Sequence, residues 1–135
     1  PTMTTLVRPE RRECVVVAVW DLVVNVGVAI ARLTERAARE RFVRGEDWTV
    51  RSLVIVQQSG WNRRRLTEEA FAVARAFPAF GSGWLRALDD PRVRVPSSDG
   101  LVWADPDATR LRPTLPYLDR RCRARSRRPG SRSAA

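Results

Sequence analysis

The sequence predicts a mainly helical α+β domain that ends in a small β meander. Residues 10–43 contain no Pro and a single Gly, which is typical of a long helix. Residues 62–77 place apolar side chains at helical spacing. After Pro91, apolar and polar residues alternate, and this period of two is typical of strands.

The first third of the chain is expected to be an irregular start followed by one long helix. Residues 1–9 form the irregular start. In residues 10–43, polar side chains recur at roughly helical spacing and leave a broad apolar arc along one side. An alternative stays open, because residues 14–20 are rich in β-branched side chains and also fit a strand that leads into a helix beginning at Asp21.

The middle of the chain is expected to contain two or three shorter elements. Residues 48–58 fit a helix that closes at Gly60, and they fit a buried strand equally well. Residues 62–77 form the clearest helix, which Pro78 stops. Residues 82–89 are expected to form a further short helix.

Three short strands are expected near the end of the domain, at residues 92–95, 101–104 and 109–112. Segments rich in turn-forming residues separate them, which favours a meander. Residues 10–119 are therefore interpreted as one globular domain. Residues 120–135 form an Arg-rich tail that is expected to be disordered.

The basic residues limit the classes of function. All 25 are Arg, there is no Lys and no His, and the formal net charge is +10. Without His there is no Ser-His-Asp or Cys-His nucleophile and no His-containing zinc site; without Lys there is no Walker A loop or Schiff base. We predict no catalytic residue, no metal ligand and no cofactor. Seven of the arginines lie in residues 120–135 without an acid, which fits a phosphate-binding arm and equally a solvated tail.

The cysteines and the apolar stretches indicate where the chain resides. Two cysteines without a C-x-x-C pair do not make a disulfide scaffold, so a reduced, cytoplasmic setting is expected. Residues 14–31 are apolar, but they are short for a membrane span and carry Asp21 and Asn25 in their middle. No contact with a membrane is predicted.

Several segments carry a resemblance to a known family of regulators. These are Val19-Trp20-Asp21-Leu22-Val23-Val24 with Ala31-Arg32-Leu33, then Trp48-Thr49 through Leu53, Val56 and Gly60, and finally Gly100-Leu101-Val102 with Asp105, Asp107, Arg110 and Thr114. Together they resemble the MarR family of winged helix-turn-helix proteins over most of residues 10–115. The chain departs from that family by a longer segment before Gly100 and by an Arg-rich tail where the family has closing dimerisation helices.

The resemblance implies a winged-helix-like fold and a dimeric transcriptional regulator that binds double-stranded DNA. It implies a homodimer through residues 11–43 and a groove-binding helix at residues 82–89, with Arg86 reading a base edge. The arginines expected to contact phosphate are Arg63, Arg64, Arg65, Arg92, Arg94, Arg110 and Arg112. Their simpler interpretation is a solvated turn for the first three and the exposed face of a strand for Arg92 and Arg94.

Two other classes of binding function and one enzymatic class stay open. One is a small structural or interaction subunit of a nucleoprotein or phage particle, in which the tail threads among nucleic acid. The other is a divergent α/β domain that binds a nucleotide ligand. In that layout residues 49–56 are a central strand and residues 57–61 a ligand loop, an arrangement that resembles macro domains, which bind ADP-ribose. The enzymatic class is one in which Pro1 acts as an amino-terminal base, a feature that resembles tautomerases.

Overall fold

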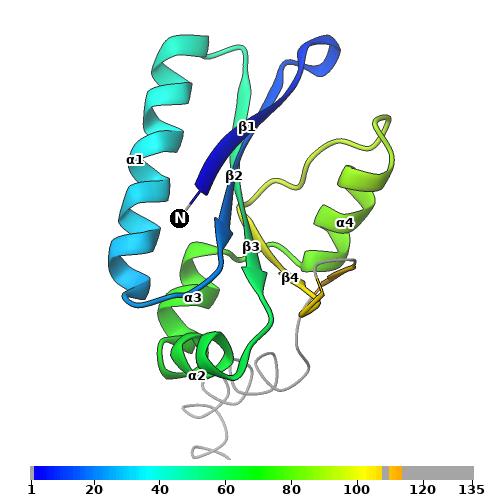
Figure 1. Cartoon of the computed structure of the whole chain (residues 1–135). Helices are drawn as coiled ribbons and strands as arrows, with labels where there is room; N and C mark the ends of the chain where they lie inside the picture. Colours follow the sequence, from blue (N-terminus) through cyan, green and yellow to red (C-terminus); the bar gives the residue numbers. More distant parts are fainter. Residues whose placement is uncertain (1, 108–109, 114–135) are drawn as a thin grey trace, which may run out of the picture.

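A mixed five-stranded sheet is the centre of the computed structural model, which describes residues 2–107 and 110–113. The strands are β1 Thr2–Arg8, β2 Glu13–Trp20, β3 Thr49–Gln57, β4 Gly100–Ala104 and β5 Leu111–Arg112. They follow one another across the sheet in chain order. β2, β3 and β4 run parallel, whereas β1 and β5 run antiparallel to their neighbours at the two edges (Figure 1).

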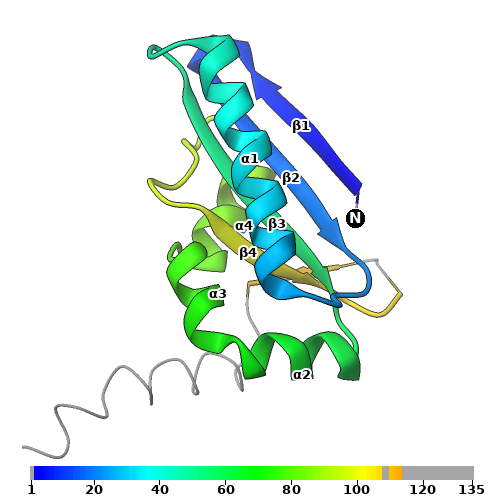
Figure 2. The same ribbon diagram turned by 90° about the vertical axis from the view of Figure 1, so that its left-hand side faces the viewer.

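Helices cover both faces of this sheet. They are α1 Val26–Arg44, α2 Gly60–Glu68, α3 Ala70–Ala76 and α4 Gly81–Asp89. α1 and α3 lie on one face and α4 lies on the other (Figures 1 and 2). α2 lies across the end of the sheet at which β3 ends (Figure 2). The chain is therefore an α/β domain.

The core consists of two apolar layers that share the strands. On the α1 side, residues of β2, β3 and β4 pack with Leu33, Leu66 and Val73. On the α4 side, Trp84 packs on the opposite faces of the same strands. Because both faces are covered, the central strands are nearly continuous apolar runs. Gly100 makes room for Trp84, since a Cβ at Gly100 would lie 2.1 Å from Cδ1 of that indole.

This fold corrects the predicted fold class. The chain is not a mainly helical α+β domain of winged-helix-like form, because the sheet is mixed and its long strands come early in the sequence. Residues 10–43 are not one helix: they form a short 3₁₀ turn, β2 and α1, and residues 21–25 separate the last two. The alternative strand at residues 14–20 is confirmed. Its helix begins at Val26 rather than Asp21, because Asn25 supplies the cap.

Further elements differ from the expectation. Residues 1–9 are not irregular, because β1 pairs along its whole length with β2. For residues 48–58, where helix and buried strand were equally open, the strand is confirmed as β3. Residues 62–77 divide at Glu69 into two helices.

The predicted meander is wrong as well. Residues 92–95 form no strand, because this segment is held by side chains of β1 and β2 rather than by a neighbouring strand. β4 pairs in parallel with β3, and its antiparallel partner β5 is only two residues long. Residues 120–135 and Thr114 lie outside the described residues. The helix on which the expected homodimer through residues 11–43 depended does not exist.

Candidate functional site

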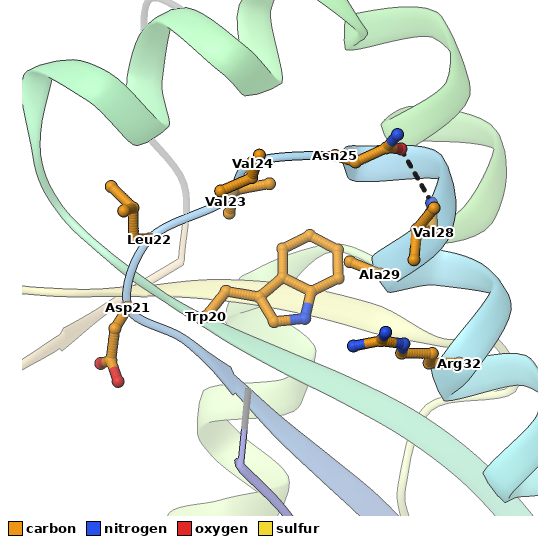
Figure 3. Close-up of a pocket in the computed structure, with 9 residues that line it drawn as sticks. All are labelled: Trp20, Asp21, Leu22, Val23, Val24, Asn25, Val28, Ala29 and Arg32. Carbon is orange, nitrogen blue, oxygen red and sulfur yellow. Dashed lines mark hydrogen bonds between the residues drawn. The ribbon is translucent and has the colours of Figure 1, made fainter.

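A hollow of about 460 Å³ lies at the end of β2. Its lining consists of residues 20–25 and of Val28, Ala29 and Arg32 on one side of α1 (Figure 3). We call it the β2–α1 hollow. The parallel strands all end at this edge of the sheet, and open α/β sheets bind their ligands outside the carboxyl ends of the strands.

A buried asparagine of α2 fixes the loop that forms the hollow. The side-chain Nδ2 of Asn62 donates to the carbonyl of Asp21 at 2.9 Å and to that of Gln57 at 2.8 Å. Its Oδ1 accepts from the main-chain N–H of Val23 at 2.9 Å. Trp61 adds a bond from Nε1 to the carbonyl of Val23 at 2.7 Å. The loop is therefore tied to the end of β3 and to the first turn of α2.

The first turn of α1 presents main-chain donors beside the hollow. The Asn25 side chain accepts from the N–H of Val28 at 3.0 Å and so caps the helix (Figure 3). The N–H groups of Val26 and Gly27 precede any possible intrahelical acceptor. No acidic residue lies in this turn, so the positive end of the helix dipole is not neutralised there.

The indole of Trp20 places an N–H donor in the wall of the hollow. Trp20 is only 3% exposed, and its ring meets Phe77 edge-on at a centroid distance of 6.0 Å. Among the described residues, nothing accepts a hydrogen bond from its Nε1–H, although the residue lines the hollow. The N–H is therefore an open donor in the wall of the hollow, where the oxygen of a ligand can accept from it.

Arg32 differs from the other arginines of α1. Arg36, Arg39 and Arg44 each pair with a glutamate of the same helix, and Arg41 donates to the carbonyl of Val50. Arg32 has no such partner in the part of the chain that the structure describes. Figure 3 shows its guanidinium and the indole nitrogen of Trp20 at the same end of the hollow. This end therefore offers a positive charge and several N–H donors.

The remainder of the lining is apolar and carries one acid. Leu22 is 63% and Val24 is 67% exposed, which is high for branched aliphatic side chains. Asp21 lies at the end opposite Arg32, and its carboxylate is turned away from Trp20 (Figure 3). The hollow can thus hold a ligand with an anionic group at one end, an apolar body, and a hydroxyl or amine at the other end.

The eight arginines predicted to bind DNA do not lie at one place. Arg63, Arg64 and Arg65 lie on α2, and Arg110 and Arg112 lie at or beside β5, near the ends of the parallel strands. Arg92 and Arg94 lie at the opposite end of the sheet, in the segment that contacts the turn between β1 and β2. Arg86 lies on α4.

Three of these arginines have partners within the protein. Arg65 pairs with Glu68 at 3.6 Å and covers the Trp61 ring at 4.8 Å from its centroid. Arg92 pairs with Asp90 at 3.1 Å, and Arg112 pairs with Asp105 at 2.7 Å.

Residues 57–61 are the ligand loop of the alternative that resembles macro domains. In the structure they mainly hold the site together. The Gln57 side chain donates to the carbonyls of Asp105 and Pro106, and Ser59 caps α2 by accepting from the N–H of Asn62. The residues that line the hollow are not predicted from the sequence, because the interpretation of residues 10–43 as one helix leaves no loop at residues 21–25. The strand alternative contained the signal: an apolar run, a short loop and an Asn cap before a helix.

Three further features were sought in the described residues: a cluster of metal ligands, a reactive thiol and a membrane-spanning helix. In residues 2–107 and 110–113, no three His, Cys, Asp or Glu side chains lie together in a way that would hold a metal ion. Burial raises the pKa of the Cys14 thiol above its ordinary value, so this group is a poor nucleophile. No helix in this part of the chain is long and apolar enough to cross a membrane.

No family model matches this chain, and neither the curated proteins nor the solved structures give a match. A function therefore has to be assigned from the residues of the β2–α1 hollow themselves. Three of its properties are specific: an anchored loop, open donors at one end, and exposed apolar walls.

Proposed function

We propose that this chain is a non-catalytic domain that binds a small phosphorylated ligand of the nucleotide class in the β2–α1 hollow. The observation that carries the proposal is the indole N–H of Trp20, an open donor in the wall of the hollow at the end where Arg32 lies, with no acceptor among the described residues. An anionic oxygen placed between these two groups would satisfy the N–H and neutralise the guanidinium.

Several donors converge on such an anion. The guanidinium of Arg32 binds phosphate strongly, since charged hydrogen bonds are about twice as strong as neutral ones. The first turn of α1, which lines the hollow through Val28 and Ala29, adds the positive end of the helix dipole. A single small anion leaves most of a hollow of about 460 Å³ empty, so the ligand has a larger body.

The remaining walls suit a nucleoside better than an aliphatic tail. Leu22, Val24 and Val28 offer flat apolar contact for a base, and their exposure is reduced when a ring covers them. Asp21 at the far end provides an acceptor for the hydroxyls of a sugar. The Asn62 anchor keeps the loop in place before the ligand arrives, which lowers the entropy cost of binding.

The test is calorimetric titration of the full chain with AMP, adenosine and inorganic phosphate at matched ionic strength. AMP is expected to bind more tightly than either fragment, because it alone fills both ends of the hollow. Arg32→Ala is expected to weaken AMP binding by at least about tenfold, since it removes a charged hydrogen bond. Trp20→Phe keeps an aromatic ring, although a smaller one, but removes the N–H, and a smaller loss is expected.

Arg39→Ala is the matched control. Arg39 lies on the same helix, is exposed and pairs with Glu35 at 2.9 Å away from the hollow. This variant is expected to bind AMP as the wild type does. Equal losses in the two arginine variants, or adenosine binding as tightly as AMP, would overturn the proposal, because either result removes the anion site.

A further inference from the structure

β1 is an unprotected edge of the sheet. It occupies one end of the strand order, and β2 is its one neighbour in the described part of the chain. Figure 2 shows β1 at the outer edge of the sheet, with no ribbon beside its far side. The outward N–H and C=O groups of an edge strand can pair with another strand.

The sequence of β1 lacks the usual devices that prevent such pairing. Natural edge strands are kept from pairing by shortness, charge, proline or a bulge. Residues 2–7 contain no charged residue and no proline, and all seven residues of β1 pair with β2 without a bulge. β5, at the other edge, has two residues, and Arg112 within it is paired with Asp105. The β5 edge is therefore short and charged, whereas the β1 edge is long and uncharged over residues 2–7.

Both faces of the β1 edge carry exposed apolar side chains. Leu6 is 41% and Val7 is 38% exposed, and neighbouring residues of a strand point to opposite faces. Met3, on the same face as Val7, packs against the core on the α1 side. A strand added at this edge would cover apolar surface on both faces of the sheet.

We propose that β1 pairs with β1 of a second copy of this chain, antiparallel and with Thr5 at the two-fold axis. In this register Thr5 faces itself, Thr4 faces Leu6, and Met3 faces Val7 of the other copy. In each pair, the two facing side chains lie on the same face of the sheet and are threonine or apolar residues, which contact each other favourably across paired strands. The two five-stranded sheets become one continuous sheet.

Charge favours a second copy in this register. The single charged residue of β1 is Arg8, at its end. Antiparallel pairing about Thr5 places Arg8 opposite Thr2 and separates the two arginines by about 20 Å along the strands. Arg8 already pairs with Glu13 at 3.6 Å in its own chain. The interface thus contains no like-charge contact.

The test is the oligomeric state of the full chain, measured by sedimentation over a concentration series. The wild type is expected to be a dimer. Thr5→Lys and Thr5→Glu each place like charges opposite one another, and each is expected to raise the dimer dissociation constant by at least about tenfold. An equal mixture of the two variants is expected to dimerise again, because opposite charges then face each other.

Thr34→Lys is the matched control, since Thr34 is an exposed threonine in the middle of α1. It is expected to leave the dimer unchanged. If the position 5 variants unfold, hydrogen exchange of the wild type replaces them. Amides of β1 are then expected to exchange more slowly at high concentration than at low concentration. A wild-type monomer, a Thr5→Lys dimer of unchanged strength, or concentration-independent exchange in β1 would overturn the proposal.

Discussion

The two ends of the parallel strands use arginine in opposite ways. At the end where β2 begins, Arg8, Arg11 and Arg51 donate to five main-chain carbonyls in residues 87–96. At the end where β2 finishes, Arg32 donates to nothing in the described part of the chain. The first group holds the end of α4 and the irregular segment that follows it. The second end keeps its charge and donors open, as a binding site requires.

This difference shows why a count of arginines does not reveal a function. A guanidinium has five N–H donors, and an irregular loop has carbonyls that need partners. In residues 87–96, arginine side chains satisfy the main-chain carbonyls. The strand that the sequence predicted at residues 92–95 is therefore not needed to pair them. The net charge is the same whether an arginine is structural or free to bind a ligand.

The largest expected effect is a loss of stability on removing a contact at the end of the sheet where β2 begins. Glu13 is buried, accepts from the N–H of Val95 at 3.0 Å and lies 3.6 Å from Arg8. Glu13→Ala leaves the half-buried Arg8 and the main-chain N–H of Val95 without this partner, and is expected to lower the free energy of unfolding by about 3–5 kcal/mol. Urea unfolding measures the loss.

Glu10→Ala controls for the loss of an acid, because Glu10 is an exposed residue of the neighbouring 3₁₀ turn. Its effect is expected to be within about 0.5 kcal/mol. A Glu13→Ala effect of the same small size would show that Glu13 does not hold the loop.

The second expected effect tests the anchor of the hollow. Asn62→Ala removes bonds to Val23, Asp21 and Gln57 and is expected to cost about 2–3 kcal/mol of stability. It is also expected to weaken AMP binding, because the loop is no longer held in place.

Gln58→Ala is the control, since this neighbouring amide is half-buried and its main-chain N–H, rather than its side chain, makes the bond to Ala104. Little change in stability or affinity is expected there. If the two variants behave alike, the loop needs no anchor from α2.

The sequence predicted the local parts of this structure and missed the parts that depend on distant partners. Residues 82–89 were expected as a helix and lie within α4, because their pattern is set by neighbours one turn away. The strand or helix choice at residues 14–20 depended on β3, which pairs with it from more than thirty residues away. β-branched residues fit both states, so the pattern could not decide.

The candidate site was harder to predict for the same reason. Asn62 holds Val23 across 39 positions, and Arg8 bonds Val93 across 85. No spacing rule covers such separations. The sequence allows Trp20 on a long helix or at the end of a strand, and only the strand places its indole at the edge of the sheet where the hollow lies.

Duplex DNA binding stays a prediction, and the comparison of the two ends sharpens it. Arg63 and Arg64 are exposed on α2 without an ion pair among the described residues, whereas Arg92 pairs with Asp90 at the other end. If DNA is bound at the α2 end, Arg63→Gln with Arg64→Gln is expected to lower the slope of log affinity against log salt by about 2. Arg92→Gln with Arg94→Gln is the matched control. Fluorescence anisotropy of the full chain measures both, and equal slopes in all proteins would exclude DNA contact through α2.

The smallest expected effect is a pH dependence at the end of the sheet where β2 begins. Hydrogen bonds from the side chain and main-chain N–H of Arg92 hold the pKa of Asp90 below its ordinary value of 3.8. A lowered pKa in the folded state stabilises the fold above the ordinary value, and this contribution disappears as the pH falls through the folded value. Asp90→Asn can keep the main-chain bond but loses the charge. It is therefore expected to lower the Tm slightly at pH 7 and to match the wild type in strong acid.

Asp89→Asn, next to it and exposed, controls for the loss of one acid. A Tm difference between Asp90→Asn and the wild type that persists unchanged in acid would mean that packing of the loop, rather than the Asp90–Arg92 charge pair, is what the variant disturbs.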